Sequence, residues 1–180
     1  MSEPHDIILR FSRRYSMAHR LTSGAAPNCC VPHGHDEIVT VDITRASCSE
    51  LDPATNMLVE FDQAKGRWFE WIDHCVDHTF HIGDNDPLIS YFREHEPALI
   101  PKLLITPGDP TTELRAACYF AKLSAFLNAG AEDLICTCIR IRETPTNTVE
   151  FKTSQISSYL PEEAGNWWHR ADLSINDLNC

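Results

Sequence analysis

Apolar and polar residues alternate along two segments near the beginning of the chain. In residues 7–19 most odd positions are apolar, while arginine and serine occupy most positions between them, and the same period of two recurs in residues 33–43. A period of two is typical of a half-buried strand, so each segment is predicted to form one, with a loop at residues 20–32 between them. The predicted inward-facing residues are Ile7, Leu9, Phe11, Tyr15, Met17 and His19 in the first strand, and His33, His35, Glu37, Val39, Val41 and Ile43 in the second.

The spacing of apolar residues changes to three and four after residue 60. This spacing, which predicts a helix of about four turns, is followed by Phe61, Ala64, Trp68, Trp71 or Ile72, and Cys75. A second helix is predicted to open at residues 109–113, which combine an N-cap candidate with an early proline and an acidic residue, and to end at Gly130.

Two further segments are rich in strand-forming residues. Residues 134–143 and 148–159 are predicted to be strands, and the short links favour an antiparallel sheet. The element order is therefore strand, strand, helix, helix, strand, strand. We divide the chain into a domain of residues 1–160 and a C-terminal extension of residues 161–180. The extension is polar apart from Trp167 and Trp168, and one interpretation is an arm that packs on a neighbouring copy.

Composition and charge narrow the class of protein. A chain of 180 residues with 43% hydrophobic and 23% charged residues is typical of one folded domain. The net charge of −11 argues against nucleic acid or an anionic membrane as a partner, although Arg13, Arg14 and Arg20 could hold phosphates locally. A solvated strand face explains these arginines equally well and is favoured. Without an apolar run of roughly 20 residues or a signal peptide, the protein is expected to be cytoplasmic. Most of its eight cysteines are expected to be reduced and structural, with Cys29 and Cys30 as the candidate exceptions.

The candidate chemistry begins with His33-Gly34-His35 at the head of the second predicted strand. Histidines two residues apart on a strand project to the same side, so both imidazoles can reach one metal ion. His19 ends the preceding strand on its apolar face, and a hairpin would bring it beside the pair. Three histidines without a fourth protein ligand are typical of a catalytic zinc site with an open position.

Other reactive side chains have more than one explanation. Cys29 lies four residues before His33 and could be a thiolate that acts as a base, while either Cys29 or Cys30 could instead be a fourth metal ligand or a buried thiol. Asp77-His78 could be an ordinary helix terminus, which the residues alone favour, or a pair in which Asp77 orients a proton-transferring His78.

The order of these motifs resembles the 6-pyruvoyltetrahydropterin synthase and 6-carboxytetrahydropterin synthase family. The resemblance covers roughly residues 6–160. The motifs that carry it are Phe11 to His19, Cys29-x-x-x-His33-Gly34-His35, Asp77-His78, Pro110-Thr111-Thr112-Glu113 and Glu143-Thr144. The sequence departs from the family where His81 and Ile82 replace its usual leucine-asparagine, and where residues 83–108 form a longer segment.

The resemblance implies a fold and a role for each matching residue. The implied fold is the α+β tunnelling fold, a four-stranded antiparallel sheet with two helices on one face. Three copies close a barrel, and two trimers stack into a homohexamer. The implied zinc (Zn2+) ligands are His19, His33 and His35, the implied catalytic residues are Cys29, Asp77 and His78, and the implied substrate-binding residues are Glu143, Thr112 and Glu113.

The implied activity is that of a zinc-dependent carbon–carbon lyase acting on a pterin triphosphate. The first choice is 6-carboxytetrahydropterin synthase. This enzyme converts 7,8-dihydroneopterin triphosphate to 6-carboxytetrahydropterin, acetaldehyde and triphosphate, a step toward deazapurine nucleosides such as queuosine. The alternatives are 6-pyruvoyltetrahydropterin synthase, which retains all three side-chain carbons, and a diverged homologue that only binds pterins.

Overall fold

The sheet is built around one long hairpin. The computed structural model describes residues 7–24, 26–47, 50–152, 156–161 and 165–178; the N-terminal residues considered for a signal peptide lie outside these ranges. β1 (Leu9–His19) pairs antiparallel with β2 (His33–Arg45), in a register that runs from Leu9 opposite Ile43 to His19 opposite His33. The apolar faces predicted from the alternation point into the core.

Four strands are antiparallel, as the sequence predicts. β5 (Leu134–Arg142) pairs with the free side of β2, and β6 (Thr148–Phe151) pairs with β5. β6 is shorter than the predicted strand, part of which (residues 153–155) lies outside the described residues.

The prediction of a four-stranded, wholly antiparallel sheet is wrong in number and direction. β3 (Thr79–Gly83) runs parallel to β1, and β4 (Leu103–Thr106) runs parallel to β3. The result is a six-stranded mixed sheet with the order β4-β3-β1-β2-β5-β6. The two added strands are short and mostly buried, so they show no alternation that a sequence pattern could reveal.

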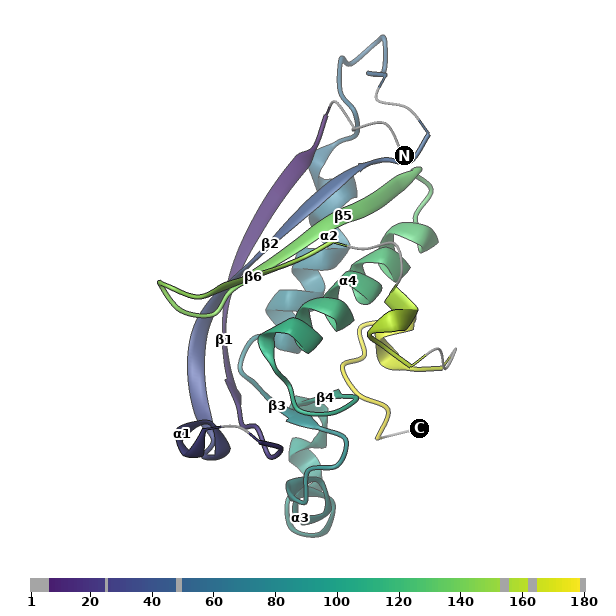
Figure 1. Ribbon diagram of the computed structural model, residues 1–180. Coiled ribbons are helices and arrows are strands. Elements are labelled where there is room, and N and C mark those ends of the chain that lie inside the picture. The colour runs from purple at the N-terminus through teal and green to yellow at the C-terminus, as the bar shows by residue number, and fades with distance from the viewer. Residues whose placement is uncertain (1–6, 25, 48–49, 153–155, 162–164, 179–180) are drawn as a thin grey trace.

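Two helices cover one face of the sheet, as predicted (Figure 1). α2 (Phe61–Trp71) continues into a π-helical turn (Ile72–Val76), and α4 (Thr112–Ala129) packs beside it. α4 begins two residues later than expected because Thr111, not Asp109, is its N-cap, with the Thr111 side chain accepting a hydrogen bond from Leu114 N. Asp109 instead accepts hydrogen bonds from the backbone of Thr22 and Ser23. The main core lies between these helices and the sheet.

A second, smaller core lies beside β3 and β4. α3 (Leu88–His95) and the 3-10 segment Pro97–Lys102 connect these two parallel strands. They belong to the segment that is longer than the family pattern. The buried members of this core are Ile82, Ile89, Leu103 and Ile105, with Phe80, Phe92 and Leu178 packed against them.

The C-terminal segment packs into its own chain. Trp167 is fully buried and stacks on Trp71 at a ring-centroid distance of 5.9 Å, while its Nε1 donates to Ile105 O. Lys122, also fully buried, donates to the carbonyls of Trp167 and Arg170. Burial lowers the pKa of Lys122 to about 8. The two tryptophans that were interpreted as part of an arm on a neighbour therefore complete the core of the same subunit, and the division at residue 160 stays a prediction.

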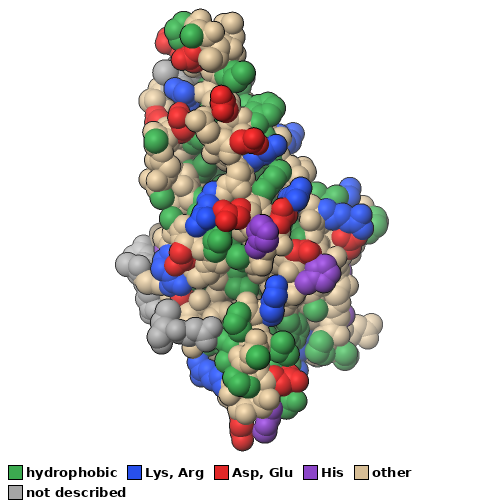
Figure 2. All heavy atoms as spheres, turned by 180° about the vertical axis from the view of Figure 1, so that it is seen from behind, with side chains coloured by type: hydrophobic (Ala, Val, Ile, Leu, Met, Phe, Trp, Pro, Cys, Tyr) green, Lys and Arg blue, Asp and Glu red, His purple; other side chains and the backbone are tan. Residues whose placement is uncertain are grey.

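Acidic and basic side chains lie next to one another on the face shown in Figure 2. Arg13, Arg14 and Arg20 each pair with a carboxylate, namely Asp73, Asp36 and Asp86. The exposed pairs of Arg13 and Arg14 agree with a solvated strand face, whereas Arg20 lies just beyond β1 and its pair with Asp86 is largely buried. Six cysteines are free thiols, and Cys48 and Cys180 lie outside the described residues. None of the helices in the described ranges combines the length and the hydrophobicity that a membrane crossing requires.

Candidate functional site

Three histidines meet where the β1–β2 hairpin is connected. The register pairs His19 with His33 and Met17 with His35, so the step of two residues along β2 places all three rings on one face. One side-chain nitrogen from each histidine lies within 4.8 Å of the other two, and the Nε2 atoms of His19 and His33 are 3.0 Å apart. The structure therefore brings together the three residues predicted to bind a metal ion.

Backbone carbonyls hold the second nitrogen of two of these rings. His19 Nδ1 lies 3.2 Å from Pro110 O, and His33 Nδ1 lies 2.8 Å from Val31 O. Because a carbonyl oxygen only accepts hydrogen bonds, each Nδ1 carries the hydrogen and each Nε2 presents a lone pair. Two facing lone pairs at this distance repel each other unless a cation lies between them, so the donor set fits a metal ion.

The charge state of His19 agrees with a role as a ligand. Burial, assisted by the positive charge of Arg115, lowers the pKa of His19 to about 4. The ring is therefore neutral near pH 7, the form that binds a metal. Among the described residues, the group consists of the three histidines alone, so neither Cys29 nor Cys30 belongs to it as a fourth ligand.

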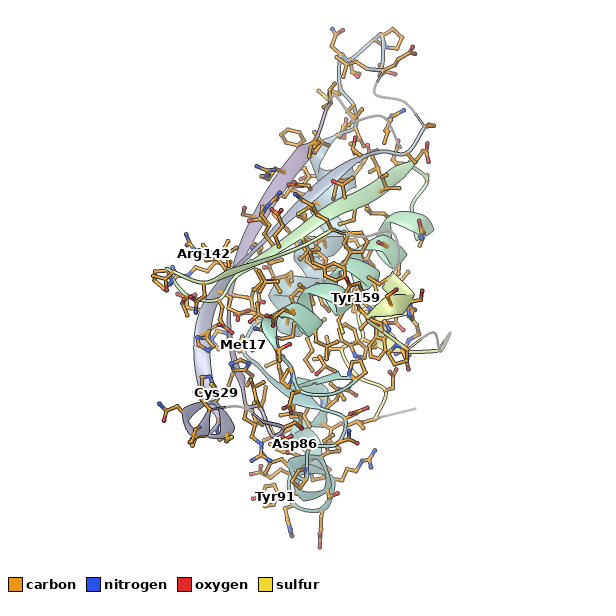
Figure 3. The ribbon with its side chains drawn as sticks, in the orientation of Figure 1. Met17, Cys29, Asp86, Tyr91, Arg142 and Tyr159 are labelled. Carbon is orange, nitrogen blue, oxygen red and sulfur yellow. The ribbon has the colours of Figure 1, made fainter. Side chains whose placement is uncertain are left out.

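Cys29 lies in α1 (Pro27–Cys30), a single helical turn between β1 and β2 where the sequence predicts only a loop (Figure 3). The Cys29 carbonyl accepts a hydrogen bond from Leu21 N at 2.8 Å, which ties the turn to the end of β1. Cys29 is partly buried, whereas Cys30 is exposed and its Sγ donates to Ala26 O at 3.7 Å. The two adjacent thiols thus have different surroundings.

Asp77 and His78 form a hydrogen-bonded pair between the π-helical turn and β3. Asp77 Oδ1 accepts from Ser16 N at 2.8 Å, and Asp77 Oδ2 accepts from His78 Nδ1 at 2.7 Å. Although burial opposes the shift, these hydrogen bonds lower the pKa of Asp77. His78 has a φ of 58°, which is uncommon for a residue with a side chain, and its side chain is 77% exposed. The ionised Asp77 leaves His78 Nε2 free for proton transfer.

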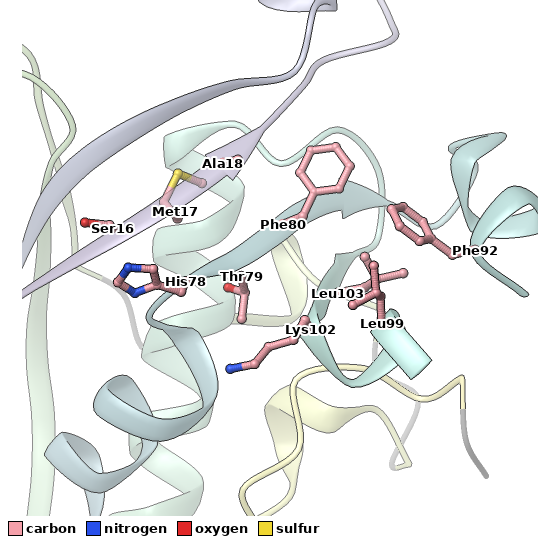
Figure 4. Close-up of a pocket in the computed structure, with 10 residues that line it drawn as sticks. All are labelled: Ser16, Met17, Ala18, His78, Thr79, Phe80, Phe92, Leu99, Lys102 and Leu103. Atoms are coloured by element: carbon pink, nitrogen blue, oxygen red, sulfur yellow. The ribbon is translucent and has the colours of Figure 1, made fainter. Parts of the chain in front are cut away.

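This pair does not face the three histidines of the same chain. His19 and His81 are paired in register and both buried, so Ala18 and Phe80 project from the opposite face of the sheet. His78 lines a pocket of about 400 Å³ on that opposite face (Figure 4). The longer segment contributes part of the wall, since the lining includes Phe92, Leu99 and Lys102 together with Ser16, Ala18 and Phe80.

Glu143 follows β5, and Thr112 begins α4. Thr112 Oγ1 donates to Glu143 Oε1 at 2.6 Å, so the structure brings together two of the three residues predicted to bind the substrate. The Glu143 side chain is 21% exposed, and its Oε1, which accepts from Thr112, also lies 3.6 Å from Arg115 Nη2. The third, Glu113, is exposed on the next position of α4.

Sequence reasoning missed a fully buried ion pair below this site. Arg115 donates from Nη1 and Nη2 to the two carboxylate oxygens of Glu37, at 2.7 Å and 2.8 Å, and both side chains have no exposed area. Tyr15 OH also donates to Glu37, at 2.5 Å. The available signal was Glu37 itself, a charged residue in the middle of an apolar strand face, because a buried carboxylate requires a partner.

Comparisons with known proteins agree with this architecture. The family described as 6-pyruvoyl tetrahydropterin synthase matches residues 8–154. An uncharacterised protein of Wolinella succinogenes aligns with a TM-score of 0.62 at 19% identity, covering 82% of this chain and 99% of that one. The 6-pyruvoyl tetrahydropterin synthases of Caenorhabditis elegans and Plasmodium vivax align with TM-scores of 0.55 and 0.51, at 22% and 14% identity. They cover 82% of this chain and 96% and 100% of their own. A search of curated protein sequences finds no match.

Proposed function

The chain belongs to the 6-pyruvoyl tetrahydropterin synthase family, whose members are lyases acting on a pterin triphosphate, and we propose that it is a zinc-dependent 6-carboxytetrahydropterin synthase. In this reaction 7,8-dihydroneopterin triphosphate and water give 6-carboxytetrahydropterin, acetaldehyde and triphosphate. The observation that carries the proposal is the three-histidine cluster with its converging lone pairs. The same chain holds the Glu143 carboxylate in position through Thr112.

His19, His33 and His35 would hold the zinc ion. Three neutral imidazoles suit zinc and leave a coordination position open. When bound, the ion would supply charge stabilisation to substrate oxygens that become negative during the reaction. Pro110 O and Val31 O fix two of the rings, and would thereby leave the Nε2 atoms of His19 and His33 available to hold the ion.

Cys29, Asp77 and His78 are proposed to move protons. Asp77 accepts from His78 Nδ1, so His78 Nε2 can take or give a proton, and Cys29 serves as the second exchanging group. Because His78 lies on the other sheet face from the histidine cluster, we propose that Asp77 and His78 serve the site of a neighbouring copy. A closed homohexamer of two trimers would bring the two halves together.

Glu143 is proposed to bind the pterin ring. A carboxylate accepts two hydrogen bonds from the adjacent N–H donors along the edge of a pterin, a charge-assisted contact. Thr112 holds one oxygen of Glu143, which supports this role by fixing the carboxylate plane.

We expect His33→Ala and His35→Ala to lose the metal ion, because each removes one of three nitrogen donors. Wild-type protein should contain about one zinc per chain by mass spectrometry of the purified sample, and each variant far less. His95→Ala, at an exposed position of α3, is the matched control and should keep the ion. Wild-type zinc content in both ligand variants would show that the ion lies elsewhere.

A turnover assay tests the reaction itself. Incubation with 7,8-dihydroneopterin triphosphate should release acetaldehyde together with triphosphate. The second candidate, 6-pyruvoyl tetrahydropterin synthase activity, is favoured by the names of the matched family and of two similar structures. It would release triphosphate without acetaldehyde. Release of neither product, from protein loaded with zinc, would leave only a pterin-binding role.

A further inference from the structure

The buried Glu37–Arg115 pair makes contacts beyond its own ion pair. Burying both charges away from water is costly, and well-packed apolar residues often replace such pairs without loss of stability. The other hydrogen bonds of Arg115 are therefore informative. Its Nε donates to Pro110 O at 3.2 Å, and its Nη2 donates to Thr112 Oγ1 at 3.1 Å.

Pro110 O connects Arg115 to the metal half of the site. The same carbonyl that accepts from Arg115 Nε also lies 3.2 Å from His19 Nδ1. A carbonyl oxygen has two lone pairs, so it can accept from both groups. Arg115 thereby fixes the position of the carbonyl that sets the tautomer of His19.

Thr112 connects Arg115 to Glu143. Arginine has no acceptor atom, so the Thr112 hydroxyl must accept from Arg115 and has a single hydrogen left to donate. That hydrogen goes to Glu143 Oε1 at 2.6 Å. Arg115 thus orients the Thr112 hydroxyl toward Glu143, and this hydrogen bond fixes one oxygen of the Glu143 carboxylate.

We propose that Arg115 is a positioning residue that holds both halves of the site, the metal ligand His19 through Pro110 O and the carboxylate Glu143 through Thr112. Glu37, which also accepts from Tyr15 OH, accepts two hydrogen bonds from the guanidinium and keeps it in place. The ligand class at Glu143 is a planar heterocycle with adjacent N–H donors, an identification that rests on the proposed function.

The first test compares Thr112→Val with Thr112→Ser, using neopterin as the probe. Valine keeps the shape but removes the hydroxyl, while serine keeps it. Thr112→Val should bind neopterin about tenfold more weakly than wild type, because a hydrogen bond to a charged group is lost. Thr112→Ser should bind like wild type. Both should keep their zinc content and their midpoint of urea unfolding, which separates this role from a merely structural one.

The second test concerns Arg115→Lys, which keeps a positive charge beside Glu37 but lacks the fork that reaches Pro110 and Thr112 together. Competition with a chelator should show zinc affinity lowered about ten- to a hundredfold, and neopterin binding should weaken as well. Thr112→Val should weaken neopterin binding alone. If Arg115→Lys does not fold, the comparison of Thr112→Val with Thr112→Ser still tests the link to Glu143.

Two outcomes would overturn the inference. Wild-type zinc affinity in folded Arg115→Lys removes the link to His19. Wild-type neopterin affinity in Thr112→Val removes the link to Glu143 through the Thr112 hydroxyl, and leaves only the direct 3.6 Å contact of Arg115 Nη2 with Glu143 Oε1. A wild-type protein that binds no neopterin contradicts the proposed function instead. The chelator competition still tests Arg115 in that case, because it requires no pterin.

Discussion

Cys29→Ala is expected to lower turnover by about a hundredfold to ten-thousandfold, the range for losing one positioned proton-transfer group. Cys30→Ala, the matched control, should remain close to wild type because its thiol is exposed and hydrogen-bonded within its own helical turn. Steady-state rates on zinc-loaded protein are the measurement. An active Cys29→Ala beside an inactive Cys30→Ala would show that Cys30, not Cys29, is the catalytic thiol. Two active variants would contradict the proposed chemistry.

His78→Ala should lower turnover by a similar factor. Mixing the two variant subunits tests whether His78 serves the site of another copy. His78 and the histidine cluster lie on opposite faces of one sheet, so we propose that a site combines Cys29 of one copy with His78 of another. Mixed oligomers of Cys29→Ala and His78→Ala should therefore regain about a quarter of the wild-type activity, since random mixing leaves that share of sites with both groups. Mixtures as inactive as their components would place the complete site within one chain.

Arg115→Met is expected to destabilise the fold by about 3–5 kcal/mol, because it leaves Glu37 as a buried carboxylate without its counter-charge. This is a large part of the roughly 5–15 kcal/mol that keeps a typical domain folded. Urea unfolding of the variant, followed by fluorescence of the buried tryptophans, gives the value.

The control for this prediction is the double variant Glu37→Leu with Arg115→Met. Replacing both charges removes the unpaired group, so the double variant should be more stable than Arg115→Met alone. A loss below about 1 kcal/mol in Arg115→Met would show that water reaches Glu37 and that the pair is less isolated than its burial indicates.

Much of the fold was predictable because its elements carry a visible period. α2 and α4 bury stripes of apolar residues, and the sequence pattern reveals both. β1 and β2 alternate, so the hairpin that brings His19 beside His33 and His35 follows from the sequence. β3 and β4 were missed because a short strand that is mostly buried has no polar face to alternate with. The parallel pairing of β4 with β3 depends on the α3 crossover, which lies in the segment that is longer than the family pattern.

The cluster of His19, His33 and His35 was predictable from the sequence, whereas the arrangement around it was not. The role of Asp77 and His78 is implied by the family resemblance and stays a prediction, and the left-handed backbone at His78 follows from no periodic pattern. Arg115 was missed for a different reason. A charged residue on a helix is normally assigned to solvent, and its burial follows only from the proximity of Glu37 on a distant strand.

The position of the last described residues has a consequence for how the protein is made. Trp167 lies against Trp71, and Ile175 O accepts a hydrogen bond from Ile105 N, so residues near the C-terminus complete the packing around α2 and β4. During translation the N-terminal elements leave the ribosome first, and the apolar surface that Trp167 covers stays open until that residue emerges. The nascent hairpin and helices therefore expose this apolar surface to solvent until Trp167 is synthesised. A chaperone that binds apolar surface would act during this interval.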